Sequence, residues 1–327
     1  MFMEKAIVIT TVNSPTKGCK QFAKLPGFSL VVAGDNTTPH NWNINKATFL
    51  TILDQKKKYP KLFGLVAQNH YARKNFAYLE AILAGVKQIF ETDDDNIPYS
   101  SFPNFVNKNR EIIELKGQTF INVYSQFTKQ HVWPRGLPLN FVRTRAQKET
   151  RKLIRPLIQQ VLADIDPDVD AIYRLTNGRP VKFKKNKIVA LARGTYSPLN
   201  SQATFWSKDV FQLLYLPSTV NSRVTDIWRG YIAQRILWEL ESSLIFLSPC
   251  VYQERNVHNL MKDFRDELDL YIKTEEMIKV LTKTKLSGSI RSMMIQVYKS
   301  LIQNLFFKKE ELMILKSWLS YFDNNGK

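Results

Sequence analysis

The chain has 327 residues, of which 44% are hydrophobic and 23% charged, as in an ordinary globular protein with one large domain and room for an appended region. Its net charge is +18, and residues 108–193 alone hold 18 basic and 7 acidic side chains. This excess favours polyanions, anionic lipid head groups or phosphorylated substrates, with general solubility as the alternative. Two cysteines are too few for a disulfide framework. The sequence shows no signal peptide and no apolar run near the roughly 18–20 residues of a membrane-spanning helix. We therefore expect a cytoplasmic protein.

The N-terminal part predicts strands that alternate with helical turns. Residues 5–12 and 28–33 have the apolar character of buried strands, and residues 19–25 between them are long enough for one or two helical turns. Polar residues follow both strands, and ligands of open α/β sheets bind at the carboxyl ends of strands. Thr11, Asn13 and Asp35 are therefore candidate ligand contacts, with Asn13 and Asp35 suited to a base or ribose. A role as turn residues is the alternative.

Residues 71–85 predict a helix, because apolar residues recur at helical spacing and Gly85 follows as a stop. Arg73 and Lys74 lie in its first turn, where cations oppose the helix dipole. Cations at an unfavourable end are more easily understood if an anion lies nearby. We therefore expect Arg73 or Lys74 to contribute a positive charge to an anion site.

The acidic stretch at residues 91–96 follows a short predicted strand and contains three consecutive carboxylates. Alternate residues of a strand end point to one face, so Asp93 and Asp95 can converge on a divalent cation, Mn²⁺ or Mg²⁺. Asp94 is expected to point away, toward a ribose or a backbone contact, and Glu91 to face away from the metal. A solvated acidic turn is the alternative interpretation.

The rest of the chain divides at residue 258. Within residues 1–258, segments 109–126 and 180–195 alternate as strands do, and residues 143–162 predict a helix broken by Pro156. A helix is expected over residues 227–240, with Thr225 or Asp226 as its cap. Residues 259–327 predict amphipathic helices that pack on the first part or on a partner, or that lie on a membrane surface.

Several blocks, in one order, resemble the STELLO family of glycosyltransferase-like proteins over roughly residues 5–260. They are Lys74-Asn75-Phe76-Ala77-Tyr78-Leu79, Ile89-Phe90-Glu91-Thr92-Asp93-Asp94-Asp95-Asn96, Trp133-Pro134-Arg135-Gly136-Leu137-Pro138, Asp166-Pro167-Asp168-Val169-Asp170-Ala171-Ile172-Tyr173-Arg174-Leu175, Tyr196-Ser197-Pro198-Leu199-Asn200-Ser201-Gln202 and Asp226-Ile227-Trp228-Arg229-Gly230-Tyr231. The resemblance implies an α/β fold of the GT-A type, a Rossmann-like mixed sheet flanked by helices, followed here by a C-terminal helical appendage. It also implies a nucleotide-diphospho-sugar donor, UDP-linked by family habit.

The resemblance suggests further site residues. Enzymes of this type that invert the anomeric centre often place a general base at an acidic helix start, which makes Asp226 the candidate. A histidine near the end of the catalytic domain often completes the metal site, which singles out His258, and Arg255 is a candidate for the diphosphate. From its own chemistry, the amide of Asn200 suits sugar hydroxyls. An aromatic side chain such as Trp206 can cover a sugar face, but core packing is the favoured role for it.

These features together predict a metal-dependent glycosyltransferase that moves a sugar from a nucleotide-diphosphate donor to an acceptor hydroxyl in glycan or polysaccharide synthesis. A non-catalytic partner or scaffold protein with the same fold and a nucleotide-sugar mutase are the alternatives. A nucleic-acid partner is suggested by the positive charge alone and is the least favoured alternative. Whether the reaction inverts or retains configuration stays open.

Overall fold

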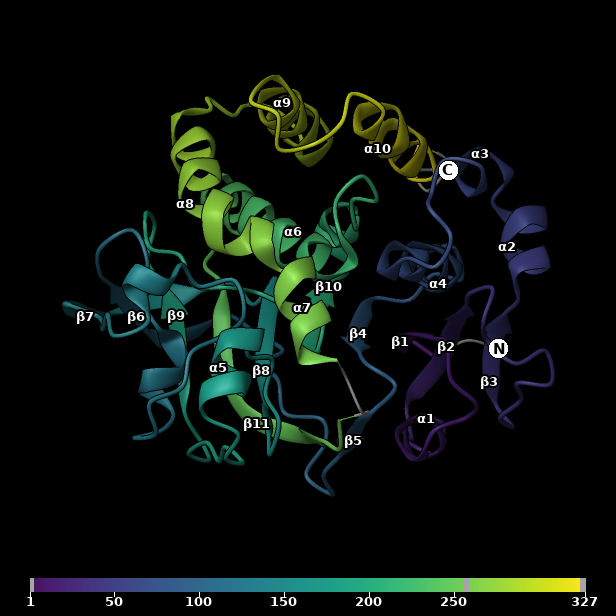
Figure 1. Ribbon diagram of the computed structural model, residues 1–327, viewed down its shortest axis with the longest axis horizontal. Coiled ribbons are helices and arrows are strands. Elements are labelled where there is room, and N and C mark those ends of the chain that lie inside the picture. Colours follow the sequence, from purple (N-terminus) through teal and green to yellow (C-terminus); the bar gives the residue numbers. More distant parts are fainter. Residues whose placement is uncertain (1–2, 256–258, 324–327) are drawn as a thin grey trace.

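The computed structural model describes residues 3–255 and 259–323, and within these ranges the chain forms one mixed sheet with helices around it (Figure 1). The strands are β1 (Lys5–Thr11), β2 (Phe28–Gly34), β3 (Ala47–Leu50), β4 (Gln88–Thr92), β5 (Asn96–Pro98), β6 (Arg110–Lys116), β7 (Lys148–Ile154), β8 (Ile158–Asp164), β9 (Ile188–Leu191), β10 (Ala203–Ser207) and β11 (Ile245–Gln253). The α-helices are α1 (Lys17–Phe22), α2 (Ile52–Lys58), α3 (Pro60–Phe63), α4 (Lys74–Leu83), α5 (Ala171–Thr176), α6 (Ser222–Leu237), α7 (Leu260–Asp266), α8 (Leu268–Lys283), α9 (Ile290–Gln303) and α10 (Glu311–Ser320). Short 3₁₀ helices are η1 (Tyr71–Arg73), η2 (Val123–Gln126), η3 (Leu139–Phe141), η4 (Lys208–Leu214) and η5 (Trp238–Leu240).

The sheet runs in the order β3-β2-β1-β4-β10-β8-β11-β9-β6-β7, with β5 paired to β11 outside this path. Strands β3, β2, β1 and β4 are parallel, and β10 runs antiparallel between β4 and β8. Because the chain leaves β1 toward β2 on one side and returns to β4 on the other, the strand order reverses between β1 and β4. Such a switch point is where open α/β sheets bind ligands.

Both faces of the sheet are buried, as the strand period requires. In β1, Ala6 and Val8 belong to one hydrophobic cluster, while Ile7 and Ile9 belong to a second cluster on the opposite face. The predicted α/β class is therefore confirmed. The predicted strands over residues 5–12 and 28–33 and the helix over residues 71–85 are confirmed as well, the last of these opening with the 3₁₀ turn η1.

The helix predicted over residues 143–162 is wrong. This stretch forms the strands β7 and β8, separated by Arg155, Pro156 and Leu157. All seven residues of β8 are buried, and β8 pairs with β10 on one side and with β11 on the other. Strand pairing supplied by distant segments therefore outweighs the weak helical pattern of this stretch.

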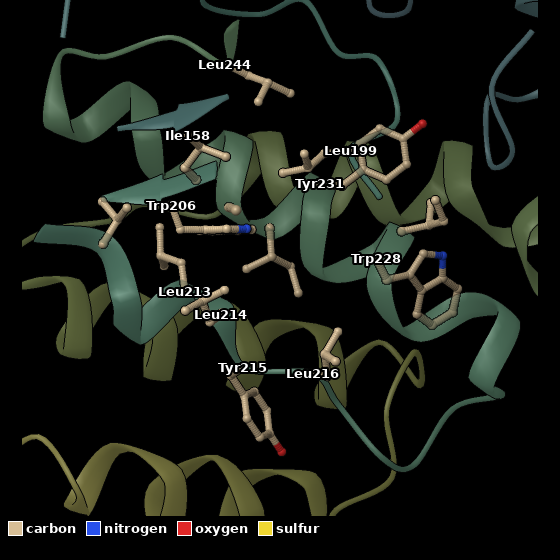
Figure 2. Packing of buried hydrophobic residues seen from close by; sticks show 14 of the residues in the cluster. Ile158, Leu199, Trp206, Leu213, Leu214, Tyr215, Leu216, Trp228, Tyr231 and Leu244 are labelled. Carbon is tan, nitrogen blue, oxygen red and sulfur yellow. The ribbon is translucent and has the colours of Figure 1, made fainter. Parts of the chain in front are cut away.

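The C-terminal helices are part of the main core. Figure 1 shows α8, α9 and α10 in an arc along one side, with α10 beside α3. Their residues Met277, Val297 and Trp318 share one hydrophobic cluster with Ile158 and Trp206 of the sheet. Figure 2 shows Tyr215 in this packing with its hydroxyl directed toward these helices, where it donates a hydrogen bond to Glu311. The predicted packing of these helices on the first part of the chain is thus confirmed.

No helix within the described ranges is long and apolar enough to cross a membrane.

Candidate active site

A cavity of about 480 Å³ opens at the carboxyl ends of β1, β2 and β4, at the switch point of the sheet. This volume is within the roughly 300–1,000 Å³ of small-molecule sites. Many of the residues selected from the sequence line it: Thr11, Asn13, Asp35, Asp93, Asp94, Asp95, Asp226 and Arg255. The three strand ends therefore converge as expected.

The acidic turn is held in place through Asp94. Its Oδ2 accepts hydrogen bonds from the hydroxyl of Thr11 and, at 2.9 Å, from the side-chain nitrogen of Asn13, while its backbone carbonyl accepts one from Thr16. On the other side, α1 packs so tightly that a Cβ on Gly18 would lie 2.1 Å from the carbonyl oxygen of Asn96. The side chain of Asp94 thus ties β1 to the turn, which leaves Asp93 and Asp95 on either side of it.

Asp93 lies next to the buried ammonium group of Lys74. The hydroxyl of Tyr71 donates to its Oδ1 at 2.6 Å, and the ammonium of Lys74 lies 3.7 Å from the same oxygen. Lys74 is fully buried, donates to Tyr71 and to the carbonyl of Thr92 at 2.8 Å each, and has a pKa lowered by burial. Burial raises the pKa of Asp93 to about 7, and the neighbouring charge of Asp95 adds to the rise. A bound cation would favour the ionised form of a carboxylate whose pKa is raised in this way.

Asp95 is oriented by a chain of amides. The side-chain nitrogen of Gln253 donates to its Oδ1 at 2.8 Å, and the oxygen of that amide accepts from Gln202 at 2.9 Å. Gln202 in turn accepts from the backbone N–H of Asp168 at 3.0 Å. Oxygens of Asp93 and Asp95 are the kind that Mn²⁺ and Mg²⁺ prefer. No group of three or more His, Cys, Asp or Glu side chains arranged for a metal occurs among residues 3–255 and 259–323.

Another part of the cavity lining is organised around Arg135. Its guanidinium donates to both oxygens of Asp168, at 2.7 and 2.9 Å, and to Asp226 at 3.0 Å. Asp226 also accepts from the backbone N–H of Ser201 at 3.1 Å. Burial raises the pKa of Asp226, but the charge and hydrogen bonds of Arg135 outweigh burial, so the net pKa is lowered. Asp226 is therefore an ionised carboxylate at neutral pH.

Comparisons with known proteins find similarity to one family. A family profile described as STELLO glycosyltransferases matches residues 223–326. The probable glycosyltransferase STELLO2 of Arabidopsis thaliana is 32% identical over 304 residues, which is 85% of this chain and 39% of that protein. The probable glycosyltransferase STELLO1 of the same plant is 27% identical over 339 residues, 97% of this chain and 44% of that protein.

The chain is thus similar to STELLO proteins over most of its own length, and the family profile matches its C-terminal third. It spans about two fifths of the length of these curated relatives. The match at residues 223–326 covers α6 and the C-terminal helices, so the likeness extends beyond the limit near residue 260 that the sequence blocks suggested.

The STELLO-like blocks that are far apart in the sequence meet at one cavity. Arg135, Asp168, Gln202 and Asp226 come from four separate blocks, and all four line the cavity beside the acidic turn. Of these, the sequence reasoning selected only Asp226 as a site residue. Arg135, Asp168 and Gln202 lie within the STELLO-like blocks, and this position was the one sign in the sequence that they belong to the site. Gln253 lies outside these blocks and carries no such sign.

Some selected residues lie outside the cavity lining. Arg73 is buried with its guanidinium 4.8 and 4.4 Å from the ring centres of Phe63 and Phe76, so it packs in the core. Asn200 is buried and uses its Oδ1 to accept from the N–H of Gln202 at 3.0 Å, which shapes the loop. Lys74 acts from beneath Asp93, as described above. His258 lies outside the described residues.

Of two secondary expectations, core packing of Trp206 is confirmed and the cap of α6 is corrected. Trp206 is fully buried and donates its ring N–H to Glu91 at 2.7 Å, so it belongs to the core, as Figure 2 shows, and cannot cover a sugar. The helix α6 is capped by Asn221, whose side chain accepts from the N–H of Arg223 at 2.9 Å, and begins before Thr225 and Asp226. Glu91 faces away from the cavity as expected, because it is fully buried against Trp206 and Arg229.

Proposed function

We propose that this chain is a metal-dependent glycosyltransferase that transfers a sugar from a nucleotide-diphosphate donor, a UDP-sugar, to a hydroxyl of a glycan acceptor. The observation that carries the proposal is the cavity at the switch point of the sheet, which Asp93, Asp95 and Asp226 all line. Similarity to the STELLO glycosyltransferases supports the same reaction class.

The charge of the cavity favours a cation together with the donor. Six carboxylates line it (Asp35, Asp93, Asp94, Asp95, Asp168 and Asp226), against the three guanidiniums of Arg135, Arg223 and Arg255. Arg135 is engaged with two of the carboxylates. A donor diphosphate would therefore meet net negative charge beside the acidic turn. A divalent cation held by Asp93 and Asp95 would supply Lewis-acid stabilisation of the leaving diphosphate, an effect on the order of several kcal/mol.

The chain's own residues divide the remaining tasks. Asn13 and Asp35 lie at the ends of β1 and β2, where a nucleoside would sit, and Arg255 can approach the phosphates from the end of β11. Asp226 would accept the proton of the attacking hydroxyl if the reaction inverts. Arg135 keeps this carboxylate ionised and oriented, at the cost of some of its basicity.

Thermal unfolding of the full chain with UDP, with and without Mn²⁺, tests the proposal. A ligand at about 100 times its dissociation constant stabilises by roughly 2.7 kcal/mol, so a clear rise in Tm is expected with UDP and Mn²⁺ together. Asp95→Asn should abolish the rise, because it removes a metal-ligand charge. Asp269→Asn, an acid on α8 paired with Lys273 and far from the cavity lining, is the matched control and should retain it.

A panel of GDP, CDP and ADP beside UDP would identify the preferred base. Absence of any nucleotide response in the unmodified chain would contradict the proposal and favour a non-catalytic partner protein.

A further inference from the structure

A second cavity, of about 360 Å³, adjoins the first. Arg255 lines both cavities, and so does the loop after β8: Asp168 faces the first cavity, while Asp166, Pro167 and Val169 line the second. The remaining wall comes from α5, the segment at residues 177–181 and Leu260 of α7. Arg255 and the loop after β8 therefore separate the two cavities, and Asp168 of this loop belongs to the Arg135–Asp168–Asp226 group.

Positive charge dominates this second cavity. Arg174, Arg179 and Arg255 line it, and Asp166 is its one lining carboxylate among the residues that the structure describes. Arg174 and Arg255 are largely buried, with 10% and 13% of their side chains exposed. Arg174 and Arg255 are each paired with one carboxylate, Asp166 and Asp263 respectively, so the positive charge left over in the lining is that of Arg179.

The hydrogen-bond donors of these arginines also exceed their acceptors. Arg174 donates to Asp166 and, at 3.1 Å, to the carbonyl of Pro167, while Arg255 donates to Asp263 at 3.0 Å. Within the described part of the chain, the Nε of both arginines makes no hydrogen bond. Arg179 is exposed, and its side chain forms no hydrogen bond or ion pair with the described residues. A guanidinium has five N–H donors, so most of this capacity is unused.

The cations also act on one another. The pKa of Arg255 is lowered by burial and further by the positive charges of Arg174 and Arg223. The rest of the lining mixes apolar residues such as Pro180 with the amide of Asn177. The site thus combines planar, forked donors with both apolar and polar groups.

We propose that this second cavity binds an anionic group of the acceptor, a phosphate or a carboxylate, and so holds the acceptor beside the transfer site. Guanidinium pairs with either anion in a two-pronged geometry. The inference rests on the proposed function, because it names the class of acceptor for that reaction. It assigns Arg174 and Arg179 to acceptor recognition and leaves the donor to the acidic turn.

Binding of small probes to the full chain, measured by ligand-observed NMR with and without UDP and Mn²⁺, tests the inference. The probes are glucose 6-phosphate, glucuronate and uncharged glucose. Because a hydrogen bond to a charged group contributes about 1.5–3 kcal/mol, we expect at least one anionic probe to bind about tenfold more tightly than glucose. The phosphate and carboxylate probes distinguish the two sources of charge.

Arg179→Ala is the decisive variant, because the side chain is exposed and its removal leaves the core intact. It should weaken the anionic probe about fivefold to tenfold, as expected for loss of one charged partner, and leave glucose and UDP binding unchanged. Lys182→Ala, an exposed cation on the same segment outside the cavity lining, is the control for net charge. Equal effects of the two variants, or equal binding of glucose and both anionic probes, would overturn the inference.

Two outcomes separate this inference from the proposed function. If Arg179→Ala weakens UDP binding, the second cavity serves the donor and the inference fails while the proposed function stands. If the unmodified chain binds an anionic probe through Arg179 but never binds UDP, the anion site stands and its role in sugar transfer is lost.

Discussion

Arg135 connects two carboxylates that the sequence separates widely. Its partners Asp168 and Asp226 lie 33 and 91 residues away, and all three side chains are buried. One guanidinium thereby sets the position and the ionisation of Asp226, the candidate base. A buried arginine with two acceptors has little freedom to move, so the carboxylate is pre-organised.

Asp226→Asn keeps the size of the side chain and an acceptor for the N–H of Ser201, but removes the charge. If Asp226 is the base, turnover should fall by about 10²- to 10⁴-fold, the usual contribution of general-base catalysis. Initial-rate assays and UDP titration measure the effect, and nucleotide binding should change little. Asp209→Asn, an acid paired with Arg155 away from the cavity, is the control. Near-normal turnover in Asp226→Asn would remove the assignment.

Glu91 and Arg229 form a buried ion pair beneath the site. Arg229 donates to the two carboxylate oxygens of Glu91 at 2.8 and 3.0 Å, and Glu91 also accepts from Trp206 and Tyr78. Neither charge has access to water, so each depends on the other.

Arg229→Met should lower the free energy of unfolding by about 3–5 kcal/mol, because Glu91 remains buried without its counter-charge. Urea unfolding measures the loss. Adding Glu91→Gln should recover part of it, and Arg193→Met, at an exposed pair with Glu239, should cost about 1 kcal/mol or less. If the double variant is no more stable than Arg229→Met, the loss comes from packing and not from the unpaired charge.

At the scale of elements, the position of α6 relative to the loop at residues 196–202 sets the geometry of the site. Gly230 makes the close approach possible, because a Cβ there would lie 2.3 Å from the carbonyl oxygen of Leu199. The same contact keeps the N–H of Ser201 within 3.1 Å of Asp226. The glycine in the middle of this helix is therefore explained by packing.

Gly230→Ala would ordinarily favour a helix, but here the clash with Leu199 should reverse the sign. We expect a loss of about 1–3 kcal/mol in stability, as for other overpacked sites, together with weaker nucleotide binding. Thermal unfolding with and without UDP and Mn²⁺ measures both. Gly64→Ala, where a Cβ would meet nothing within 4 Å, is the control. An unchanged or raised Tm in Gly230→Ala would show that α6 can move without consequence.

At the scale of the whole molecule, the C-terminal helices and the sheet share one core. Trp318 of α10 is fully buried, donates to the carbonyl of Gln212 at 3.0 Å and packs against Tyr215. At the far edge of the sheet, the first six residues of β7 are exposed and include Lys148, Arg151 and Lys152. Charged side chains on an edge strand discourage pairing with another chain, which accounts for part of the basic excess.

Trp318→Ala should lower the free energy of unfolding by about 3–5 kcal/mol, as expected for truncation of a large buried aromatic side chain. On heating, the helical circular-dichroism signal and nucleotide binding should be lost at the same temperature, because the helices and the site belong to one cooperative unit. Met313→Ala on the exposed side of the same helix is the control and should change stability little. If binding survives after the helical signal of this region is lost, the C-terminal helices form an independent unit.

Local patterns in the sequence were sufficient to predict the strands and helix of the N-terminal part of the fold and about half of the residues that line the site. The apolar runs of β1 and β2, the helical spacing of α4 and the acidic turn each depend on neighbours within a few residues. The parallel arrangement of those strands then brings Thr11, Asp35 and Asp93 to one cavity. These features are visible in sequence because the periods of strands and helices are local properties.

Only the tertiary structure decided the rest. The buried strand β8 contains Gln159 and Gln160, whose side chains form hydrogen bonds with distant groups such as the N–H of Val106 and the carbonyl of Ala203. Because of these two polar residues, the sequence of β8 does not show the apolar pattern of a buried strand. Arg135 sits in a loop without local period, and its role comes from Asp168 and Asp226. Burial and charge pairing between distant segments determine the conformation or role of such residues, and a single sequence does not record which segments meet.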